Sequence, residues 1–262
     1  MAGYWADRCV VVSGSTRGIG EATVRHFAAL GARCVVHGTD VGRGSALADE
    51  LAGLGAEAAF VAADLSDEAG CRRLVDAAYD AFGAVDVLVN NAGANRFHGV
   101  LEASPTDVDS CLALDLRAAW LTSRRVVQRA GHRGGSIVNV SSNHAFATLP
   151  GVFPYNVAKA GVQALTQSLA IELAGSGFRA NTVVPGYVDT PINVAYFGTF
   201  EDPAGERRRV EALHPLGRIG RPDEVARAIA FLASDEEAGF ITGTSLVVDG
   251  GRSALLQDPV AR

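Results

Sequence analysis

Residues 9–20, CVVVSGSTRGIG, place three glycines directly after a short run of β-branched residues. The run predicts a buried strand, and Gly14, Gly18 and Gly20 predict a tight turn that opens a helix. Free amides at a helix N-terminus bind phosphate, and glycines let it approach closely. The stretch therefore predicts a dinucleotide site. Its spacing, Gly-x-x-x-Gly-x-Gly, differs from Gly-x-Gly-x-x-Gly, so a tight connection without a ligand is the alternative.

The same alternation of strand and helix runs along the whole chain. Nearly continuous apolar runs are typical of parallel strands buried on both faces, and strand-helix repeats imply right-handed crossovers. We expect an α/β fold with a doubly wound, Rossmann-type sheet of seven parallel strands and helices on both faces, in a single domain spanning residues 1–262. The expected strands are residues 9–14, 33–38, 58–65, 85–93, 135–142, 179–186 and 245–251.

One segment interrupts this alternation. Residues 190–216, TPINVAYFGTFEDPAGERRRVEALHPL, are too long for an ordinary connection and are rich in aromatic and charged residues. We expect a substrate lid over about 190–216, with residues 206–210, ERRRV, on a solvent-exposed helix.

Composition argues against several classes of function. The 262 residues carry a formal charge of -6 that is dispersed along the chain, which disfavours nucleic acid as a partner. The start, MAGYWADR, lacks the apolar core of a secretory signal, and no apolar run reaches the ~18 residues of a membrane helix. We expect a cytoplasmic protein with no membrane partner. Cys9, Cys34, Cys71 and Cys111 lie far apart and away from histidines at metal-ligand spacing, so we expect reduced packing residues and no metal site.

Polar motifs recur further along the chain, most of them at strand ends. They are Asp64, NNAG at 90–93, Ser142, Tyr155-x-x-x-Lys159, PGYVDTP at 185–191 and GFITGTSLVVDGG at 239–251. With the glycine turn, their order resembles the short-chain dehydrogenase/reductase family, in its compact branch similar to 3-oxoacyl carrier-protein reductases and sugar or polyol dehydrogenases. The resemblance covers nearly the whole chain except the lid and the tail, and it implies an oxidoreductase with a nicotinamide cofactor.

The resemblance also implies positions for that cofactor. It puts the pyrophosphate over the glycine turn, Asp64 at the adenine, Asn90 with Ala92 and Gly93 at the adenosine, and Thr190 near the nicotinamide amide. Taken alone, Asp64 could be a helix N-cap, and the asparagines could close a turn. The full expected set is Gly14, Ser15, Thr16, Arg17, Gly18, Ile19, Gly20, Gly38, Thr39, Asp64, Leu65, Asn91, Ala92, Gly93, Tyr155, Lys159, Pro185, Gly186, Val188 and Thr190.

Arg17 and the end of the second strand favour NADP(H) over NAD(H). An NAD-dependent enzyme of this type resembles a pattern with a carboxylate near Gly38, which binds the ribose hydroxyls and repels a 2′-phosphate. Here Gly38 is neutral, Thr39 can donate a hydrogen bond, and Arg17 offers a planar fork suited to phosphate. Asp40 argues the other way, and an exposed Arg17 without a ligand is the alternative.

Tyr155 and Lys159 lie one helical turn apart after Pro154, so both side chains project from one face near a helix N-terminus. A phenol with a pKa of ~10 is a poor base, but an ammonium ~4 Å away at an effective dielectric of ~20 is worth about 4 kcal/mol, or roughly three pKa units. We therefore expect Tyr155 to titrate near neutral pH. Without its context, the pair would be an ordinary helix surface pair.

The resemblance implies hydride transfer between the nicotinamide and a carbonyl carbon. Tyr155 would move the proton, Lys159 would lower the tyrosine pKa and hold the ribose, and Ser142 would polarise the substrate oxygen. Asp115 departs from the family, which usually has asparagine there. In relatives the backbone carbonyl of that residue binds a water of the proton relay, so we expect Asp115 to act through its backbone. A carboxylate that acts on Lys159 and a plain polar helix residue are the alternatives.

Residues after the motifs predict the substrate pocket. Polar groups between aromatic walls favour a small hydroxylated carbonyl compound, such as a sugar or polyol, over a steroid or a long acyl chain. A 3-oxoacyl or polyketide-type ketoreductase is the alternative, and outside enzymes a dinucleotide sensor without catalysis. The expected set is Asn95, Ser142, Asn143, His144, Phe153, Tyr187 and Tyr196, with Arg96, Phe97, His98 and Phe197 beside them.

Two long helical segments, residues 107–128 and 155–173, carry apolar residues on more than one face. The resemblance places both at a subunit interface. We therefore expect a homotetramer, with a dimer as the second choice.

Overall fold

A parallel sheet forms the centre of the computed structural model, which describes residues 3–131 and 133–255. Its seven strands stand in the order β3-β2-β1-β4-β6-β8-β9, and every neighbouring pair is parallel. The fold predicted from the sequence is confirmed. The strands are β1 (Cys9–Val12), β2 (Arg33–Gly38), β3 (Ala58–Ala62), β4 (Val87–Asn90), β6 (Gly135–Val140), β8 (Phe178–Pro185) and β9 (Ser245–Val248).

The strand order reverses at β1, which lies between β2 and β4. All four residues of β1 are completely buried, because helices cover the sheet on both sides. In open α/β sheets, ligands bind outside the carboxyl ends of the strands at such a reversal. The topology therefore points to the end of β1, where the glycine turn begins.

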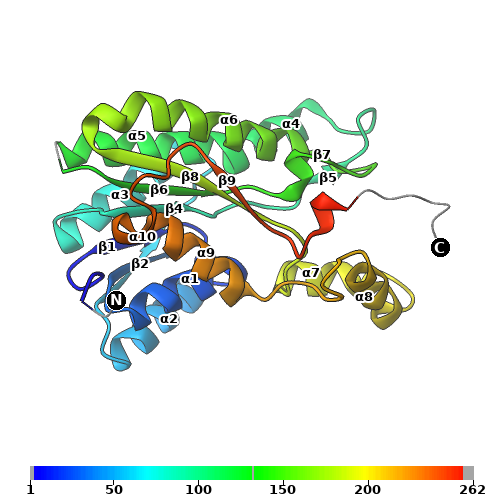
Figure 1. Cartoon of the computed structure of the whole chain (residues 1–262), viewed down its shortest axis with the longest axis horizontal. Coiled ribbons are helices and arrows are strands. Elements are labelled where there is room, and N and C mark those ends of the chain that lie inside the picture. Colours follow the sequence, from blue (N-terminus) through cyan, green and yellow to red (C-terminus); the bar gives the residue numbers. More distant parts are fainter. Residues whose placement is uncertain (1–2, 132, 256–262) are drawn as a thin grey trace.

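Helices form a layer on each face of the sheet (Figure 1). On one face, Phe27 of α1, Leu51 of α2 and Ile229 of α9 pack into one apolar cluster with the strands. On the other face, Leu74 of α3 and Leu121 of α5 belong to a second cluster, which α6 completes. The bounds are α1 (Gly18–Ala29), α2 (Val41–Gly53), α9 (Pro222–Ala233), α3 (Glu68–Phe82), α5 (Ala118–Ala130) and α6 (Tyr155–Leu173).

The helix expected over residues 107–128 contains a widened turn. It starts as α4 (Pro105–Leu112), where Ser104 and Asp107 form a capping box. It continues through the π-helical turn η1 (Ala113–Arg117) into α5. Single π turns inside α-helices are frequent at functional sites, and this one contains Asp115.

Residues 190–216 are more regular than expected. They contain α7 (Pro191–Phe197) and α8 (Pro203–Ala212), which lie at one end of the molecule, on the side of the sheet that α1, α2 and α9 cover (Figure 1). Val210 of α8 is completely buried, so the solvent exposure expected for residues 206–210 is wrong at this position. An apolar cluster with Phe197 therefore fastens α8 to α7.

A small second sheet was not predicted. In it, β5 (Phe97–His98) pairs antiparallel with β7 (Phe153–Pro154). Strands of two residues carry no periodic pattern that a sequence could reveal. The pair connects the segment after NNAG to the start of α6.

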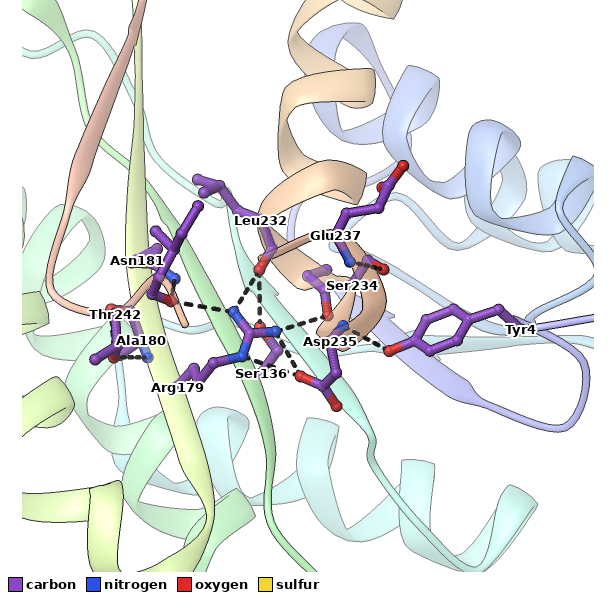
Figure 2. A network of polar contacts seen from close by, with 12 residues as sticks. Tyr4, Ser136, Arg179, Ala180, Asn181, Leu232, Ser234, Asp235, Glu237 and Thr242 are labelled. Carbon is purple, nitrogen blue, oxygen red and sulfur yellow. Dashed lines mark hydrogen bonds and ion pairs between the residues drawn. The ribbon is translucent and has the colours of Figure 1, made fainter. Parts of the chain in front are cut away.

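Arg179, near the start of β8, holds the C-terminal end of α9 in place (Figure 2). Its guanidinium donates to the carbonyls of Leu232 and Ala233 at 2.9 and 3.2 Å. It also pairs at 2.6 Å with Asp235, which begins α10 (Asp235–Ala238), and the amide of Asp235 donates to the Tyr4 hydroxyl at 2.7 Å. This network anchors the end of the sheet opposite to the carboxyl ends of the strands.

Three short 3₁₀ turns complete the described elements. No helix within residues 3–131 and 133–255 is long and apolar enough to cross a membrane. In the same ranges, no cluster of three or more His, Cys, Asp or Glu side chains could hold a metal ion. The turns are η2 (Asn143–Ala145), η3 (Ala174–Ser176) and η4 (Arg252–Ala254).

Candidate active site

A cleft of about 710 Å³ opens at the carboxyl ends of the parallel strands, at the reversal of the strand order. It brings together most of the residues expected to bind the cofactor, but Ser15 and Gly20 do not line it. From the expected set, its lining contains Gly14, Thr16, Arg17, Gly18, Ile19, Gly38, Thr39, Asp64, Leu65, Asn91, Ala92, Gly93, Tyr155, Lys159, Pro185, Gly186, Val188 and Thr190.

The glycine turn leaves space and free amides at one end of the cleft. Gly14 has a φ of 61°, which residues with side chains rarely adopt, and a Cβ there would lie 2.9 Å from the Cα of Ala92. A Cβ at Gly20 would lie 2.3 Å from the carbonyl oxygen of Gly14, so Gly20 allows α1 to pack against the turn. The N-cap residue Arg17 makes no side-chain hydrogen bond to the first turn of α1. The backbone amides of this turn can therefore bind an anion.

His37, in β2, supports this turn from behind. Its Nδ1 accepts a hydrogen bond from the amide of Gly14 at 2.9 Å, and its Nε2 lies 3.1 Å from the carbonyl oxygen of Ala63. These partners require the proton on Nε2, and burial lowers the pKa of His37 to about 4. The Ser15 hydroxyl accepts from the amide of His37 at 2.9 Å, so Ser15 acts behind the cleft rather than in its lining.

Ser13 and Asn91 join the glycine turn to the NNAG segment. The Ser13 hydroxyl accepts from the amides of Asn91 and Ala92 at 2.9 and 3.0 Å. In return, the Asn91 side chain donates to the carbonyls of Ser13 and Gly14, both at 3.0 Å. The two segments therefore form one hydrogen-bonded unit at the edge of the cleft.

Asn90 differs from its neighbour and corrects an expectation. Its side chain is buried, donates to Asn139 at 2.8 Å and accepts from Thr122 at 2.7 Å. Because successive side chains of a strand point to opposite sides, Asn90 faces the interior when Asn91 faces the turn. Asn90 thus connects β4 to β6 and α5, and it does not line the large cleft.

The end of β2 carries the groups that bear on cofactor choice. Arg17 and Arg43 both line the cleft here. A side chain at Gly38 has no room, because a Cβ would lie 2.7 Å from Cγ2 of Thr16. The Asp40 carboxylate accepts from the amide of Arg43 at 3.0 Å and caps α2. The carboxylate that argues for NAD(H) is therefore engaged in a helix cap.

Asp64 lies on the cleft wall and is not the cap of the following helix. Its carboxylate accepts from the amide of Ser66 at 2.9 Å, and this hydrogen bond lowers the pKa of Asp64. The N-cap of α3 is Asp67, which accepts from the amide of Gly70 at 2.6 Å. The alternative in which Asp64 caps the helix is therefore wrong, and Asp64 presents an ionised carboxylate to the cleft.

Ser142, Tyr155 and Lys159 come together at the other end of the cleft. Tyr155 is the first residue of α6, and the ammonium nitrogen of Lys159 lies 5.5 Å from the centre of its ring. Ser142 caps η2, and its side chain is a polar partner that lowers the pKa of the Tyr155 phenol. Lys159 also donates to the carbonyl of Val140 at 3.3 Å. The phenol is thus the group at which the serine and the lysine meet.

The carboxylate of Asp115 is part of the same arrangement. Its side chain is completely buried, and Oδ1 lies 3.3 Å from the Lys159 nitrogen. Both carboxylate oxygens are 3.3 Å from the amide of Ala94, which donates to them. The contacts are made by the side chain, whereas the expected role of the backbone carbonyl stays a prediction.

The pKa of Tyr155 differs from the expectation. Burial raises the pKa of Tyr155 above its ordinary value, although the Lys159 charge and the hydrogen bond to Ser142 lower it; the charge of Asp115 adds to the rise. Burial alone would lower the pKa of Lys159, but the charges of Asp115 and Tyr155 raise it overall. The titration expected near neutral pH is therefore wrong for this geometry, because it neglected burial and the carboxylate.

The part of the cleft expected to bind the substrate combines amides with aromatic rings. Tyr187 stacks on Phe197, with ring centres 6.4 Å apart, and the Arg252 guanidinium lies 4.9 Å from the centre of the Tyr187 ring. Phe153, in β7, does not line the cleft, nor do Arg96, His98 and Phe197. The expected substrate residues that do line it are Asn95, Phe97, Ser142, Asn143, His144, Tyr187 and Tyr196.

Comparison with known proteins agrees with this geometry. Residues 14–253 match the family described as enoyl-(acyl carrier protein) reductase. L-rhamnose 1-dehydrogenase (NAD(P)(+)) of Azotobacter vinelandii is 42% identical over 96% of this chain and 98% of its own. The chain belongs to the short-chain dehydrogenase/reductase family. Within this family, cis-4-hydroxycyclohexanecarboxylate dehydrogenase of Sinomonas cyclohexanicum is 40% identical over 97% of this chain and all of its own. The (2S)-[(R)-hydroxy(phenyl)methyl]succinyl-CoA dehydrogenase subunit BbsD of Thauera aromatica is 36% identical over 94% of this chain and 97% of its own.

As a short-chain dehydrogenase/reductase, the protein is an oxidoreductase of a family that uses nicotinamide cofactors. The cleft fits such a group. Gly14 and Gly18 leave its floor free of side chains, and the first turn of α1 offers amides to a pyrophosphate. At Gly93 even a methyl group would lie 2.4 Å from Oδ1 of Asp115, so the wall beside Lys159 is bare backbone.

Three residues of this short-chain dehydrogenase/reductase line or support the cleft but were not identified from the sequence. His37 carries a weak signal, as a histidine inside an otherwise apolar strand. Arg43 stands in the first turn of α2, where a cation is unfavourable to the helix dipole, and this could have marked it. Arg252 follows the GFITGTSLVVDGG motif and has no sequence signal that links it to Tyr187.

Proposed function

We propose that the protein is an NADP(H)-dependent dehydrogenase/reductase that interconverts a secondary alcohol and a carbonyl group. The observation that carries this proposal is the meeting of Ser142, Tyr155 and Lys159 at one end of a cleft whose other end is a glycine turn with free amides. A cleft that only sensed a dinucleotide would have no use for these three side chains together. The sensor alternative is therefore disfavoured.

Each of the three residues has a separate task. Tyr155 gives a proton to the substrate oxygen during reduction and takes it back during oxidation. Ser142 orients the same oxygen, because its hydroxyl and the phenol line the same cleft. Lys159 stabilises the phenolate that oxidation requires and stands beside the bare backbone at Gly93, where a ribose can approach. The nicotinamide, when bound, supplies or accepts the hydride.

The preference for NADP(H) rests on charge at the end of β2. Arg17 and Arg43 can pair with a 2′-phosphate, whereas the Asp40 carboxylate is occupied by the amide of Arg43. The relative from Azotobacter vinelandii carries NAD(P)(+) in its name, which is compatible with either form.

The substrate is proposed to be a small hydroxylated compound such as a sugar, a polyol or a cyclic alcohol. Two relatives at 40% identity or more are named for rhamnose and for a hydroxycyclohexanecarboxylate. Asn95, Asn143 and His144 offer hydrogen bonds, and Tyr187 and Tyr196 offer flat apolar walls. Tyr196 comes from α7, so we also propose that α7 and α8 act as the lid over about 190–216.

The test combines one variant with a substrate panel. We expect wild-type protein to reduce NADP⁺ with some members of a panel of aldoses, polyols, cyclic alcohols and 3-hydroxyacyl thioesters, measured by the absorbance of reduced nicotinamide. Tyr155→Phe should lose at least the ~10²-fold typical of a general acid/base and keep its affinity for NADPH. Near wild-type turnover in Tyr155→Phe would remove Tyr155 from the mechanism. Turnover with the thioesters alone would favour a 3-oxoacyl reductase.

A homotetramer in the cytoplasm remains part of the proposal. Trp120 of α5 and Val157 and Ile171 of α6 are apolar side chains with 43%, 47% and 79% of their surface exposed, which supports a contact between subunits through these helices. Light scattering at micromolar concentration should give the mass of four chains. The mass of one chain would contradict this assembly.

A further inference from the structure

Asp115 pairs a buried carboxylate with the buried ammonium of Lys159. Its side chain has no exposed surface, and that of Lys159 has only 6%. The residue lies in the π turn η1, so a widened helical turn, rather than a regular one, carries this carboxylate towards α6. An ionised carboxylate that is buried needs partners to compensate its charge.

The partners of the carboxylate come from two sides. The ammonium of Lys159 lies 3.3 Å from Oδ1, and the amide of Ala94 donates to both oxygens at 3.3 Å. A Cβ on Gly93 would lie 2.4 Å from Oδ1, so glycine is required there for the carboxylate to reach its place. Within the described residues, Asp115 is the one carboxylate paired with Lys159. The side chain therefore links the NNAG segment to the lysine that faces Tyr155.

We propose that Asp115 is a positioning residue, which holds Lys159 through a buried ion pair and, by its negative charge, moves alcohol oxidation to more alkaline solution. This inference rests on the proposed function of Tyr155 as the proton carrier. An asparagine, the usual residue of the family, could hold the same place without the charge. Aspartate thus keeps Tyr155 in its protonated form over a wider range of pH, which favours proton donation to a carbonyl.

The other groups around the phenol do not supply this effect. From α6, Lys159 lowers the pKa of Tyr155, and the hydrogen bond to Ser142, which precedes η2, lowers it too. Cys111 of α4 adds to the rise, but burial raises its own pKa to about 11, so the thiol is neutral near pH 7. His144 of η2 has its ring centre 6.3 Å from that of Tyr155, and burial and the charge of Arg252 lower the pKa of His144. Asp115 is therefore the negative charge that acts on the phenol near neutral pH.

Asp115→Asn removes the charge and keeps the size of the side chain. We expect the rising limb of the pH profile of kcat for alcohol oxidation to move to lower pH by about one unit, while the plateau stays within a few-fold of wild type. The matched control is Asp76→Asn, which removes a carboxylate that pairs with Arg125 and Arg129 across α3 and α5. This control changes the net charge equally and should leave the limb in place.

A second readout needs neither substrate nor cofactor. The phenol of Tyr155 can be titrated by ultraviolet absorbance as the difference between each protein and its Tyr155→Phe counterpart. Asp115→Asn should lower this pKa, and Asp115→Ser should do the same if the asparagine variant does not fold. Because this measurement is independent of turnover, it separates the two questions: it shows whether the Asp115 charge acts on the phenol even if Tyr155 proves not to be catalytic.

Three results would overturn the inference. An unchanged limb and an unchanged phenol titration would mean that the carboxylate does not act through its charge. A shift to higher pH would mean that its main effect is to keep Lys159 protonated. A loss of plateau turnover of about 10²-fold or more in a folded Asp115→Asn protein would make the carboxylate a participant in the chemistry rather than a positioning group.

Discussion

The two ends of the cleft are held by different kinds of interaction. At the glycine turn, neutral hydrogen bonds join His37 to Gly14 and Ser13 to Asn91. At the catalytic end, a buried ammonium and a buried carboxylate face each other, with the phenol of Tyr155 beside them. The hydrogen bonds at the first end hold the backbone in one conformation, and the ion pair at the second end sets the electrostatic environment of the phenol.

This difference fits the role that we propose for each end. A pyrophosphate needs backbone amides that are free of side chains and held in one direction, which neutral partners achieve without competing for the anion. A proton carrier needs a defined electrostatic environment, and a small change in a nearby charge alters its pKa directly. We therefore expect acid to lower the folding stability that the glycine end contributes. We expect charge substitutions at the other end to shift the pH profile of activity.

The largest expected effect concerns His37. Its folded-state pKa of about 4 lies below its ordinary value of 6.5, so the unfolded chain binds the additional proton first as the pH falls. The stability that neutral His37 contributes is complete above about pH 6.5 and declines by about 3 kcal/mol between pH 7 and pH 4. In His37→Gln this part of the decline should be absent, as measured by urea unfolding at a series of pH values.

The difference in unfolding free energy between wild type and His37→Gln isolates the contribution of His37, because the same carboxylates titrate in both proteins. Binding of NADPH gives a second measurement, since a protonated His37 can no longer accept from the Gly14 amide. If wild type and His37→Gln lose stability in parallel on acidification, His37 does not control the acid sensitivity of this end.

A smaller effect is expected for the cations at the end of β2. Arg17→Ala should weaken NADPH binding by about 10- to 100-fold through loss of a charge-assisted phosphate contact, and NADH binding much less. Isothermal titration of both cofactors measures the two values. Arg43→Ala is the companion variant, because Arg43 lines the same part of the cleft.

Asp40→Asn serves as the control for this pair. Its side chain caps α2 in the structure, and asparagine is an equally good N-cap, so neither stability nor the ratio of NADPH to NADH affinity should change by more than a few-fold. Equal losses of both cofactors in Arg17→Ala would show that Arg17 never meets a 2′-phosphate. A strong gain of NADPH affinity in Asp40→Asn would show that this carboxylate does face the ribose.

The sequence was sufficient for the sheet, because continuous apolar runs and glycine spacing depend on local chemistry alone. The sequence was insufficient where the direction or the pKa of a side chain depends on residues that are close in space but distant in sequence. Asn90 and Asn91 are adjacent and identical, yet only Asn91 lines the large cleft, since strand alternation turns the other inwards. Likewise, the pKa of Tyr155 could not be estimated from Lys159 alone, because burial and the Asp115 charge act on it as well.

Residues 190–216 show the same limit in another form. Their length and composition predicted a lid with one helix over residues 206–210, but Pro191 and Pro203 stand at the first positions of two helices, α7 and α8, where proline favours a helix start. Burial of Val210 depends on contacts with Phe197 and Ile219, which no short window of sequence contains. The expected lid motion itself stays a prediction.

The contact between Gly38 and Thr16 has a consequence for protein engineering. With the NADP(H) preference that we propose, a change to NAD(H) would call for an acidic side chain at the end of β2. Here a Cβ at residue 38 would lie 2.7 Å from the Thr16 methyl group and 3.0 Å from its hydroxyl, and threonine is stiff about χ1. A single Gly38→Asp substitution would therefore require the Thr16 side chain or the turn around it to shift. A designer would have to shorten residue 16 at the same time, so that cofactor switching in this scaffold is a problem of two coupled positions.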